Sequence, residues 1–258
     1  NQKNIRHHLY GIIDLNKKFS SGQWLKAAIK KIKEIKKRKK IPILVGGTGL
    51  YFQSLISGLV KIPKISLKIR NKIRLMHKKE GQKNFYKKLL KMDPEVKNRF
   101  DSNDTQRTIR AFEIKLTTNI SMYEWLKKTK SEFKENEFLK LYIDFNREDL
   151  VKRISLRTIK MIEEGAIKEV KKFIKLRIKK DLSVNGVIGI DELTQYLDGK
   201  INLDQAQELI SIKTRQYAKR QATWARSRMT SWKKINPIKI NDYIKRLKKS
   251  SLKLDQLT

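Results

Sequence analysis

The chain has 258 residues, 39% of them hydrophobic, and its 62 Lys and Arg against 26 Asp and Glu give a formal net charge of +36 at pH 7. This charge excludes an acidic soluble enzyme, and the length and apolar content argue against disorder throughout. The length predicts one large or two smaller domains. No run reaches the roughly 20 apolar residues of a membrane-spanning helix, so we expect no membrane partner.

The absence of cysteine excludes disulfides, thiol nucleophiles and cysteine-bound zinc, and it predicts a reducing, cytoplasmic location. His7 and His8 are adjacent and no acidic cluster accompanies them, so we expect no metal site there. No constellation of Ser, His and Asp stands out either. The chain starts at Asn1 without Met, and we expect residues before it to be missing.

The positive charge favours a phosphate-rich partner, above all nucleic acid, because each neutralised phosphate releases counterions. Part of the charge can instead reflect codon bias, since 46 of the 62 basic residues are Lys. Lysine-rich runs such as residues 36–40 are usually solvated surface. Arginines grouped with glutamine and aromatic residues are better candidates, because a guanidinium group binds phosphate bidentately and stacks on bases.

The first part of the chain predicts a helix, a strand, a glycine turn and another helix. Residues 20–39 carry apolar positions at helical spacing, with Ser20 or Ser21 as a cap. Residues 41–45 form a short apolar run typical of a strand buried on both faces. The glycine-rich turn 46–49 follows, and residues 50–55 resume a helical pattern. This order predicts a parallel α/β sheet.

The middle of the chain predicts a block of helices without strands: Leu67–His77, Gly81–Met92, Asp104–Thr117 and Ser121–Lys130. Residues 139–145 predict the strand that returns to the sheet. One long helix is then expected from Leu150 to Ile174, and a last helix over residues 203–228, with Asn202 as cap. That last helix combines arginines with aromatic residues more densely than any other segment. Residues 232–258 form a basic tail without a chemical motif.

Two segments carry candidate binding residues. The turn 46–49 follows the predicted strand, at the sheet edge where anionic ligands bind, although it lacks the lysine and spacing of a P-loop. Gln106 and Arg110 lie four residues apart, hence on one helical face with Arg107 beside them, and can grip phosphates and base edges. Two alternatives stay open: a purely structural corner at the turn, and a helix capped by Asp104 with an Arg110–Glu113 pair.

Three segments together resemble the tRNA dimethylallyltransferases, the tRNA isopentenyltransferase family: IPILVGGTGLYFQSLISGL at residues 41–59, NDTQRTIRAFEI at 103–114 and RQYAKRQATWAR at 215–226. Their order and spacing also match, and with the similar stretches at residues 7–9 and 19–20 the resemblance covers nearly the whole chain. It implies a P-loop-type α/β core over residues 1–65 and 138–258, incomplete at its N-terminus, with C-terminal helices. It also implies a helical, tRNA-binding insertion over residues 66–137.

The resemblance implies transfer of a dimethylallyl group from dimethylallyl diphosphate to N6 of adenosine 37 in tRNAs that read codons beginning with U. It implies Mg²⁺ as cofactor, with ligands largely outside this chain, the tRNA anticodon stem-loop as partner, and a monomer. By motif, Gly46, Gly47 and Thr48 would line the substrate channel, and Trp224 would lie in the core. The implied tRNA contacts are Thr48, Arg70, Gln106, Arg107, Thr108, Ile109, Arg110, Lys219, Arg220, Gln221, Thr223 and Arg226.

The chain departs from the family in two places. Family members begin with a glycine-rich P-loop and an Asp-Ser segment whose aspartate is the base, and neither occurs in these 258 residues. We therefore expect no catalytic residue in this chain, a missing central strand, and tRNA binding without product formation. Ile190 and Asp191 stand where the family usually has an aromatic and a basic residue, which weakens one expected tRNA contact.

A rival interpretation is a basic RNA-binding remnant that performs no transfer. An in-frame glycine-rich loop encoded upstream of Asn1 would favour the enzyme, and a start codon at this position would favour the remnant. A P-loop nucleotide kinase is disfavoured, because neither its phosphate loop nor an acceptor site is visible.

Overall fold

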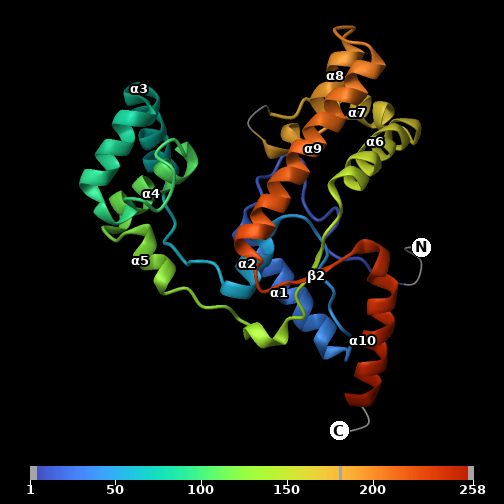
Figure 1. Cartoon of the computed structure of the whole chain (residues 1–258). Helices are drawn as coiled ribbons and strands as arrows, with labels where there is room; N and C mark the ends of the chain where they lie inside the picture. Colours follow the sequence, from blue (N-terminus) through green and yellow to red (C-terminus); the bar gives the residue numbers. More distant parts are fainter. Residues whose placement is uncertain (1–4, 180–181, 255–258) are drawn as a thin grey trace. The chain divides into compact units, whose positions relative to one another are not determined.

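The computed structural model describes residues 5–179 and 182–254, with side chains up to residue 247 (Figure 1). It divides into two compact units, residues 1–51 with 138–258 and residues 52–137. The described residues are mostly helical, and their one sheet has two strands. Within these ranges no helix combines the length and apolarity that crossing a membrane requires.

The first unit begins with helix α1 (Ser21–Lys37), which confirms the helix expected over residues 20–39. Ser20 and Gln23 form a capping box: the Ser20 hydroxyl accepts the Gln23 N–H at 3.2 Å, and Gln23 Oε1 accepts the Ser20 N–H at 2.9 Å. The helix buries Ala28 and Ile32. Helix α2 (Gly49–Ser57) follows the glycine turn, as predicted, and continues past residue 51 into the second unit.

Residues 41–45 correct the prediction of a buried strand. They have no regular secondary structure, and the side chains of Ile41, Ile43 and Val45 are 83%, 79% and 89% exposed. A strand needs a hydrogen-bonded neighbour, and no backbone hydrogen bond joins this segment to any other described residue. Apolar composition alone therefore does not make a strand here.

The sheet pairs β1 (Leu141–Ile143) with β2 (Lys233–Ile235) in parallel, with Tyr142 opposite Lys234. The strand expected within residues 139–145 is confirmed, although it is shorter. Its partner β2 lies in the segment that we expected to be only a basic tail. The sequence showed no sign of this strand, because two of its three residues are lysines, Lys233 and Lys234. Within the described residues, the expected α/β sheet core is thus reduced to one parallel pair in a mostly helical chain.

The tail also forms helix α10 (Ile240–Leu254), preceded by the short 3₁₀ turn η4 (Pro237–Lys239), while residues 255–258 lie outside the described residues. Lys233 Nζ lies 4.6 Å from the ring centroid of Tyr243 in α10. This cation–π contact fixes the helix beside the end of the sheet.

The long helix expected from Leu150 to Ile174 is two helices, α6 (Arg147–Glu163) and α7 (Ala166–Lys175). Gly165 separates them with a φ of 109°, a left-handed conformation that ends α6. Turn η3 (Ser183–Gly186), α8 (Ile190–Leu197) and α9 (Leu203–Arg228) follow. Asn202 caps α9 as predicted, and the three helices α7, α8 and α9 share a buried core of Ala166, Val170, Leu193, Ala206 and Ile210.

The second unit consists of α3 (Leu67–Met92), α4 (Thr105–Thr118) and α5 (Met122–Lys127), with short 3₁₀ turns η1 (Pro94–Val96) and η2 (Glu135–Glu137). The two helices expected before residue 92 join across a kink at Gly81, where φ is 73°. Phe85 from α3 stacks on Phe112 from α4 with centroids 4.7 Å apart. Six fully or nearly fully buried residues form the core of the unit: Ile73, Phe85, Leu89, Val96, Ala111 and Phe112.

Candidate nucleic-acid interface

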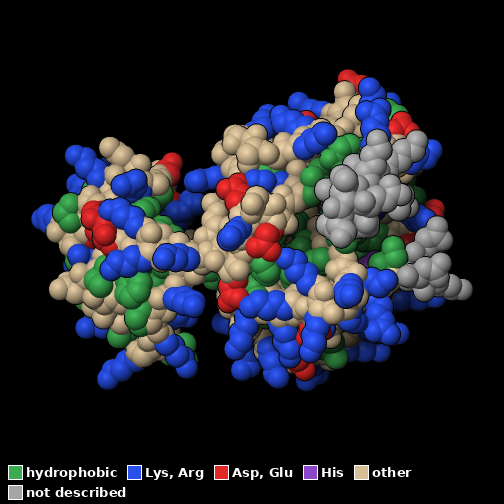
Figure 2. Space-filling model, turned by 90° about the horizontal axis from the view of Figure 1, so that it is seen from below, with side chains coloured by type: hydrophobic (Ala, Val, Ile, Leu, Met, Phe, Trp, Pro, Cys, Tyr) green, Lys and Arg blue, Asp and Glu red, His purple; other side chains and the backbone are tan. Residues whose placement is uncertain are grey.

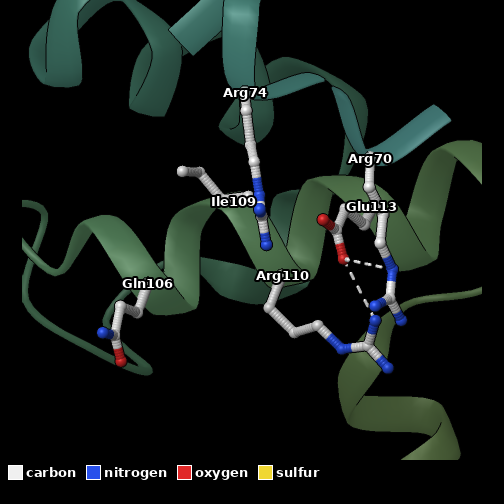
Figure 3. A pocket seen from close by; sticks show the side chains of 6 residues that line it. All are labelled: Arg70, Arg74, Gln106, Ile109, Arg110 and Glu113. Atoms are coloured by element: carbon white, nitrogen blue, oxygen red, sulfur yellow. Dashed lines mark hydrogen bonds and ion pairs between the residues drawn. The ribbon is translucent and has the colours of Figure 1, made fainter. Parts of the chain in front are cut away.

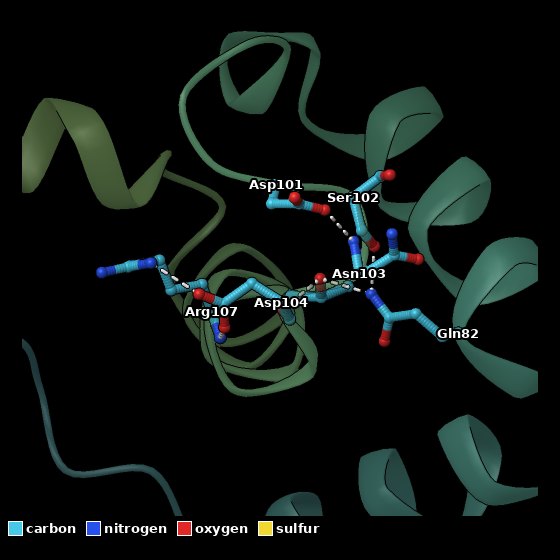
Figure 4. Close-up of polar contacts among 7 residues, drawn as sticks. Gln82, Asp101, Ser102, Asn103, Asp104 and Arg107 are labelled. Atoms are coloured by element: carbon cyan, nitrogen blue, oxygen red, sulfur yellow. Dashed lines mark hydrogen bonds and ion pairs between the residues drawn. The ribbon is translucent and has the colours of Figure 1, made fainter. Parts of the chain in front are cut away.

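The first turn of α4 is held by Asp104, as expected for a helix cap. Asp104 Oδ1 accepts the backbone N–H of Arg107 at 2.9 Å, and Asp104 Oδ2 pairs with the Arg107 guanidinium at 2.5 Å (Figure 4). The Arg107 side chain is 57% exposed. One carboxylate thus caps the helix and steadies an exposed arginine beside it.

Gln82 fixes the same turn from α3. Its amide nitrogen donates to the Ser102 carbonyl (Figure 4). The same nitrogen donates to the Thr108 hydroxyl at 3.0 Å, and the amide oxygen accepts from the Thr105 hydroxyl at 3.0 Å. His77 Nε2 lies 2.8 Å from that oxygen. Thr108 is fully buried in this network, so it supports the exposed face of α4 from behind.

A pocket of about 430 Å³ lies between α3 and α4, and Figure 3 shows the side chains around it. Arg70 and Arg74 reach it from α3, and Gln106, Ile109 and Arg110 from α4. At its wall, Glu113 Oε2 pairs with Arg110 at 3.1 Å and faces Arg70 Nε at 3.9 Å. Four of the residues that the resemblance implies, Arg70, Gln106, Ile109 and Arg110, are therefore gathered here.

Elsewhere in the second unit, the Arg99 guanidinium group lies over the ring of Tyr123, 5.2 Å from the ring centroid. Burial raises the pKa of the Tyr123 hydroxyl, and the nearby Arg107 and Arg99 act against that shift. The tyrosine therefore stays neutral at physiological pH and offers an aromatic surface beneath the Arg99 guanidinium group.

In the first unit, the glycine turn and α9 meet. A Cβ atom added to Gly47 would lie 2.1 Å from the Gln221 side chain, and one added to Gly49 would lie 2.1 Å from the indole ring of Trp224. Thr48 stands exposed between these two contacts. The structure thus brings two of the three family-like segments together, with glycine at the two positions where a side chain would collide.

The outer face of α9 carries exposed polar and cationic side chains: Lys219, Arg220, Thr223 and Arg226. Arg220 lies 5.6 Å from the centroid of the Tyr217 ring, and Arg226 donates to the Thr223 hydroxyl at 3.4 Å. Gln221 and Trp224, by contrast, are half-buried against the turn. The expectation that Trp224 lies inside rather than on this face agrees with that position.

Positive charge by itself does not mark a site. Figure 2 shows Lys and Arg side chains over much of the face in view, with few acidic ones among them. Four arginines of the pocket and of α9 have neighbouring side chains that restrict them: Arg70, Arg110, Arg220 and Arg226.

Asp191 and Glu192, at the start of α8, pair with α9. Glu192 is 1% exposed; it accepts the Gly189 N–H at 2.8 Å and forms an ion pair with Lys213. Asp191 lies 3.3 Å from the same ammonium group. The hydrogen bond to Glu192 raises the pKa of Lys213, so this ion pair fastens α8 to α9.

Two residues around the start of α4 and its pocket, Arg74 and Gln82, were missed by the sequence analysis, and the role of a third, Glu113, was only partly foreseen. Arg74 has the same spacing from Arg70 that Arg110 has from Gln106, so helical periodicity alone could have placed it on the same face. Glu113 was expected only as a local partner of Arg110, and that pair is present. Gln82 carried no signal, because its role depends on how α3 packs against α4.

We compared the chain with known proteins. A family model described as IPP transferase matches residues 1–228. The chain is 74% identical, over 257 residues, to a tRNA dimethylallyltransferase from Pelagibacter ubique, covering 100% of this chain and 82% of that protein. It is 39% identical over 226 residues to one from Rickettsia massiliae, covering 87% of this chain and 62% of that protein.

Solved structures give the same result. A eukaryotic dimethylallyltransferase acting on tRNA superposes with a TM-score of 0.74 at 29% identity, over 87% of this chain and 57% of that one. The tRNA delta(2)-isopentenylpyrophosphate transferase of Staphylococcus epidermidis superposes with a TM-score of 0.61 at 27% identity, over 96% of this chain and 82% of that one. From the matched residues, the identities and these superpositions it follows that the chain belongs to the IPP transferase family.

Proposed function

We propose that the protein represented by this chain transfers a dimethylallyl group from dimethylallyl diphosphate to N6 of adenosine 37 in tRNAs that read codons beginning with U. The observation that carries this proposal is the 74% identity over the whole chain to a tRNA dimethylallyltransferase. In the transfer, the bond from the allylic carbon to the diphosphate oxygen breaks, a carbon–nitrogen bond forms at N6, and N6 loses a proton.

The second unit is proposed to bind the anticodon stem-loop through α4. Arg70, Gln106, Ile109 and Arg110 surround one pocket, and Arg107 stands exposed beside them. A phosphate group is the ligand that paired guanidinium groups hold best, and an amide side chain can add a base-edge contact. Thr108 is proposed to act indirectly, by holding the start of α4.

The first unit is proposed to supply the adenosine channel and a second RNA contact. Gly46, Gly47 and Thr48 would line the channel, with the Thr48 hydroxyl as the group that orients the base. Lys219, Arg220, Thr223 and Arg226 on the outer face of α9 would hold the anticodon loop. Gln221 is assigned to the packing of the glycine turn as well as to the RNA, because its side chain lies against Gly47.

Family membership implies Mg²⁺, and we tested whether this chain offers a site for it. Among the described residues, no three His, Asp or Glu side chains lie close enough together to hold a metal ion. A Mg²⁺ site needs several oxygen ligands in octahedral geometry, so the described residues do not fit the ion, and we derive no step through it. We likewise assign the base for the N6 proton to no residue of this chain.

The proposal includes a cytoplasmic, monomeric protein, since tRNA is the substrate. It is tested by expressing the native open reading frame in bacteria that lack their own transferase, with the Pelagibacter ubique relative as positive control. Nucleoside mass spectrometry of total tRNA should then detect N6-dimethylallyladenosine in both strains. The contrary outcome is that the relative restores the nucleoside, whereas this protein, expressed at the same level, binds tRNA but does not restore it. In that case the rival interpretation, an inactive RNA-binding remnant, is correct.

A further inference from the structure

The pocket of the second unit contains a buried carboxylate that the proposed function does not use. Glu113, near the end of α4, has a side chain that is only 5% exposed. Its Oε2 atom lies 3.1 Å from Arg110 and 3.9 Å from Arg70 Nε, so a single oxygen faces one arginine from each helix (Figure 3). A buried carboxylate is costly unless cations compensate it, and here two of them do.

Arg70 and Arg110 remain able to bind a ligand although both face Glu113. Their side chains are 37% and 39% exposed, and both line the open pocket. The distance of 3.9 Å is too long for a hydrogen bond, and Arg70 Nε has no hydrogen-bond partner among the described residues. Because Arg70 Nε is buried, the donors left for a ligand are the terminal nitrogens of the two guanidinium groups, whose orientation Glu113 restricts.

Arg74 adds a third cation to the same pocket. It is exposed, and within residues 5–179 and 182–247 it has neither a hydrogen bond nor an ion pair. With three guanidinium groups and one carboxylate, the pocket favours an anion with several oxygen acceptors. Bidentate contacts from arginine match the oxygens of a phosphate group, and the amide of Gln106 stands at the rim for a neighbouring nucleotide.

We propose that Glu113 is a positioning residue, which orients Arg70 and Arg110 to bind one phosphate of the RNA backbone, with Arg74 as a further direct contact to that phosphate. This inference rests on the proposed function, because it takes the anion to be part of a tRNA. Pre-orientation matters because a long arginine side chain otherwise loses rotamer entropy when it binds.

The substitution Glu113→Gln separates positioning from simple charge attraction by the sign of its effect. Glutamine keeps the shape but removes one negative charge near the RNA, so charge attraction alone predicts tighter binding. Positioning predicts weaker binding, by about fivefold to tenfold, and a salt slope reduced by about 0.7–0.9 for each phosphate that is no longer neutralised. Both are measured by fluorescence anisotropy with a labelled anticodon stem-loop at several salt concentrations.

Glu124→Gln is the matched control, since it removes a carboxylate from an exposed pair with Lys127 in the same unit. It should bind as tightly as the unsubstituted chain or slightly more tightly. Where Arg70→Gln and Arg110→Gln are already present, Glu113→Gln should weaken binding no further, because no guanidinium group remains to be oriented. A further loss there would show that Glu113 acts only on the fold.

Arg74→Gln keeps the inference testable if Glu113→Gln fails to fold, which circular dichroism will show. Arg74 is exposed, so the variant should melt like the unsubstituted chain while its salt slope falls by about 0.7–0.9. Unchanged or tighter binding by Glu113→Gln, or an unchanged slope for Arg74→Gln, overturns the inference. An unchanged stem-loop affinity for Arg74→Gln, together with weaker binding of inorganic phosphate by the same variant, also overturns it, since the pocket would then hold free phosphate rather than tRNA.

The failure of the inference and that of the proposed function are distinguishable. If the unsubstituted protein forms dimethylallyladenosine in tRNA but Glu113→Gln binds the stem-loop normally, only the inference fails. If the unsubstituted protein forms no such nucleoside, while Glu113→Gln and Arg74→Gln weaken binding as described, the pocket is confirmed as an RNA site and the transferase proposal fails.

Discussion

Replacing Gly49 by alanine puts a methyl group into space that Trp224 occupies. The added Cβ would lie 2.1 Å from the indole ring, whereas carbon atoms in contact are about 3.5–4.0 Å apart. The ring or the turn must therefore move by about 1.5 Å, and such overpacking costs about 1–3 kcal/mol. For a chain of this size, 2 kcal/mol corresponds to a melting temperature lower by about 4–8 °C.

The assay is thermal denaturation followed by circular dichroism, with Gly186→Ala as the matched control. Nothing lies within 4 Å of a Cβ atom at Gly186, so that variant should melt like the unsubstituted chain. The double variant Gly49→Ala with Trp224→Leu should lose less stability than the two single losses together, because the smaller side chain makes room. If Gly49→Ala melts within about 1–2 °C of Gly186→Ala, the packing of the turn against α9 is refuted.

The remaining predictions concern the ion pair, the core of the second unit and its surface. Lys213→Gln should lower the free energy of unfolding by about 2 kcal/mol. Breaking a fully buried ion pair costs about 3–5 kcal/mol, and the loss is smaller here because the Lys213 side chain is 44% exposed, although Glu192 is buried. The pKa of Lys213 is raised in the folded chain, so its contribution to stability is complete below the ordinary lysine pKa of about 10.4 and is lost as pH rises through the pKa of the folded state. The melting temperatures of the variant and the unsubstituted chain should therefore converge at higher pH. Phe85→Ala should cost about 3–5 kcal/mol in a urea titration, as Phe85 is fully buried; a loss below about 1 kcal/mol would contradict the described core. Arg107→Ala should weaken stem-loop binding more than Lys39→Ala, and equal losses would leave only nonspecific attraction.

The helices of this chain were largely predictable because their signals are local. Ser20, Asp104 and Asn202 cap helices where the sequence places them, and α9 has its expected ends. Capping and apolar periodicity involve residues within one or two turns, so a sequence displays them directly.

The strands were less predictable, because a strand depends on residues far away in the sequence. Residues 41–45 have strand composition without a partner, whereas Lys233 and Lys234 lack that composition and pair with β1. The break at Gly165 was missed for a different reason. The apolar spacing continues across it, and only the left-handed backbone of the glycine divides the helix.

The candidate site likewise has a part that the sequence predicted and a part that depends on packing. Gln106, Arg107 and Arg110 are neighbours on one helix, so spacing predicted their shared region. The arrangement of Arg70 and Arg74 around the same pocket, and the use of Glu113 by both helices, follow from the packing of α3 on α4. No local pattern in the sequence encodes that packing.

The exposed segment at residues 41–45 has a consequence for association. Exposed and half-buried side chains alternate along it, which is the two-residue period of a strand. Ordering a disordered segment costs about 1–2 kcal/mol of free energy per residue in lost backbone entropy. A segment whose backbone is already ordered avoids part of that cost when another strand pairs with it. Ile41, Ile43 and Val45 would then contribute apolar burial on the same face. A partner strand that paired with this short run would therefore bury three exposed apolar side chains along with its backbone.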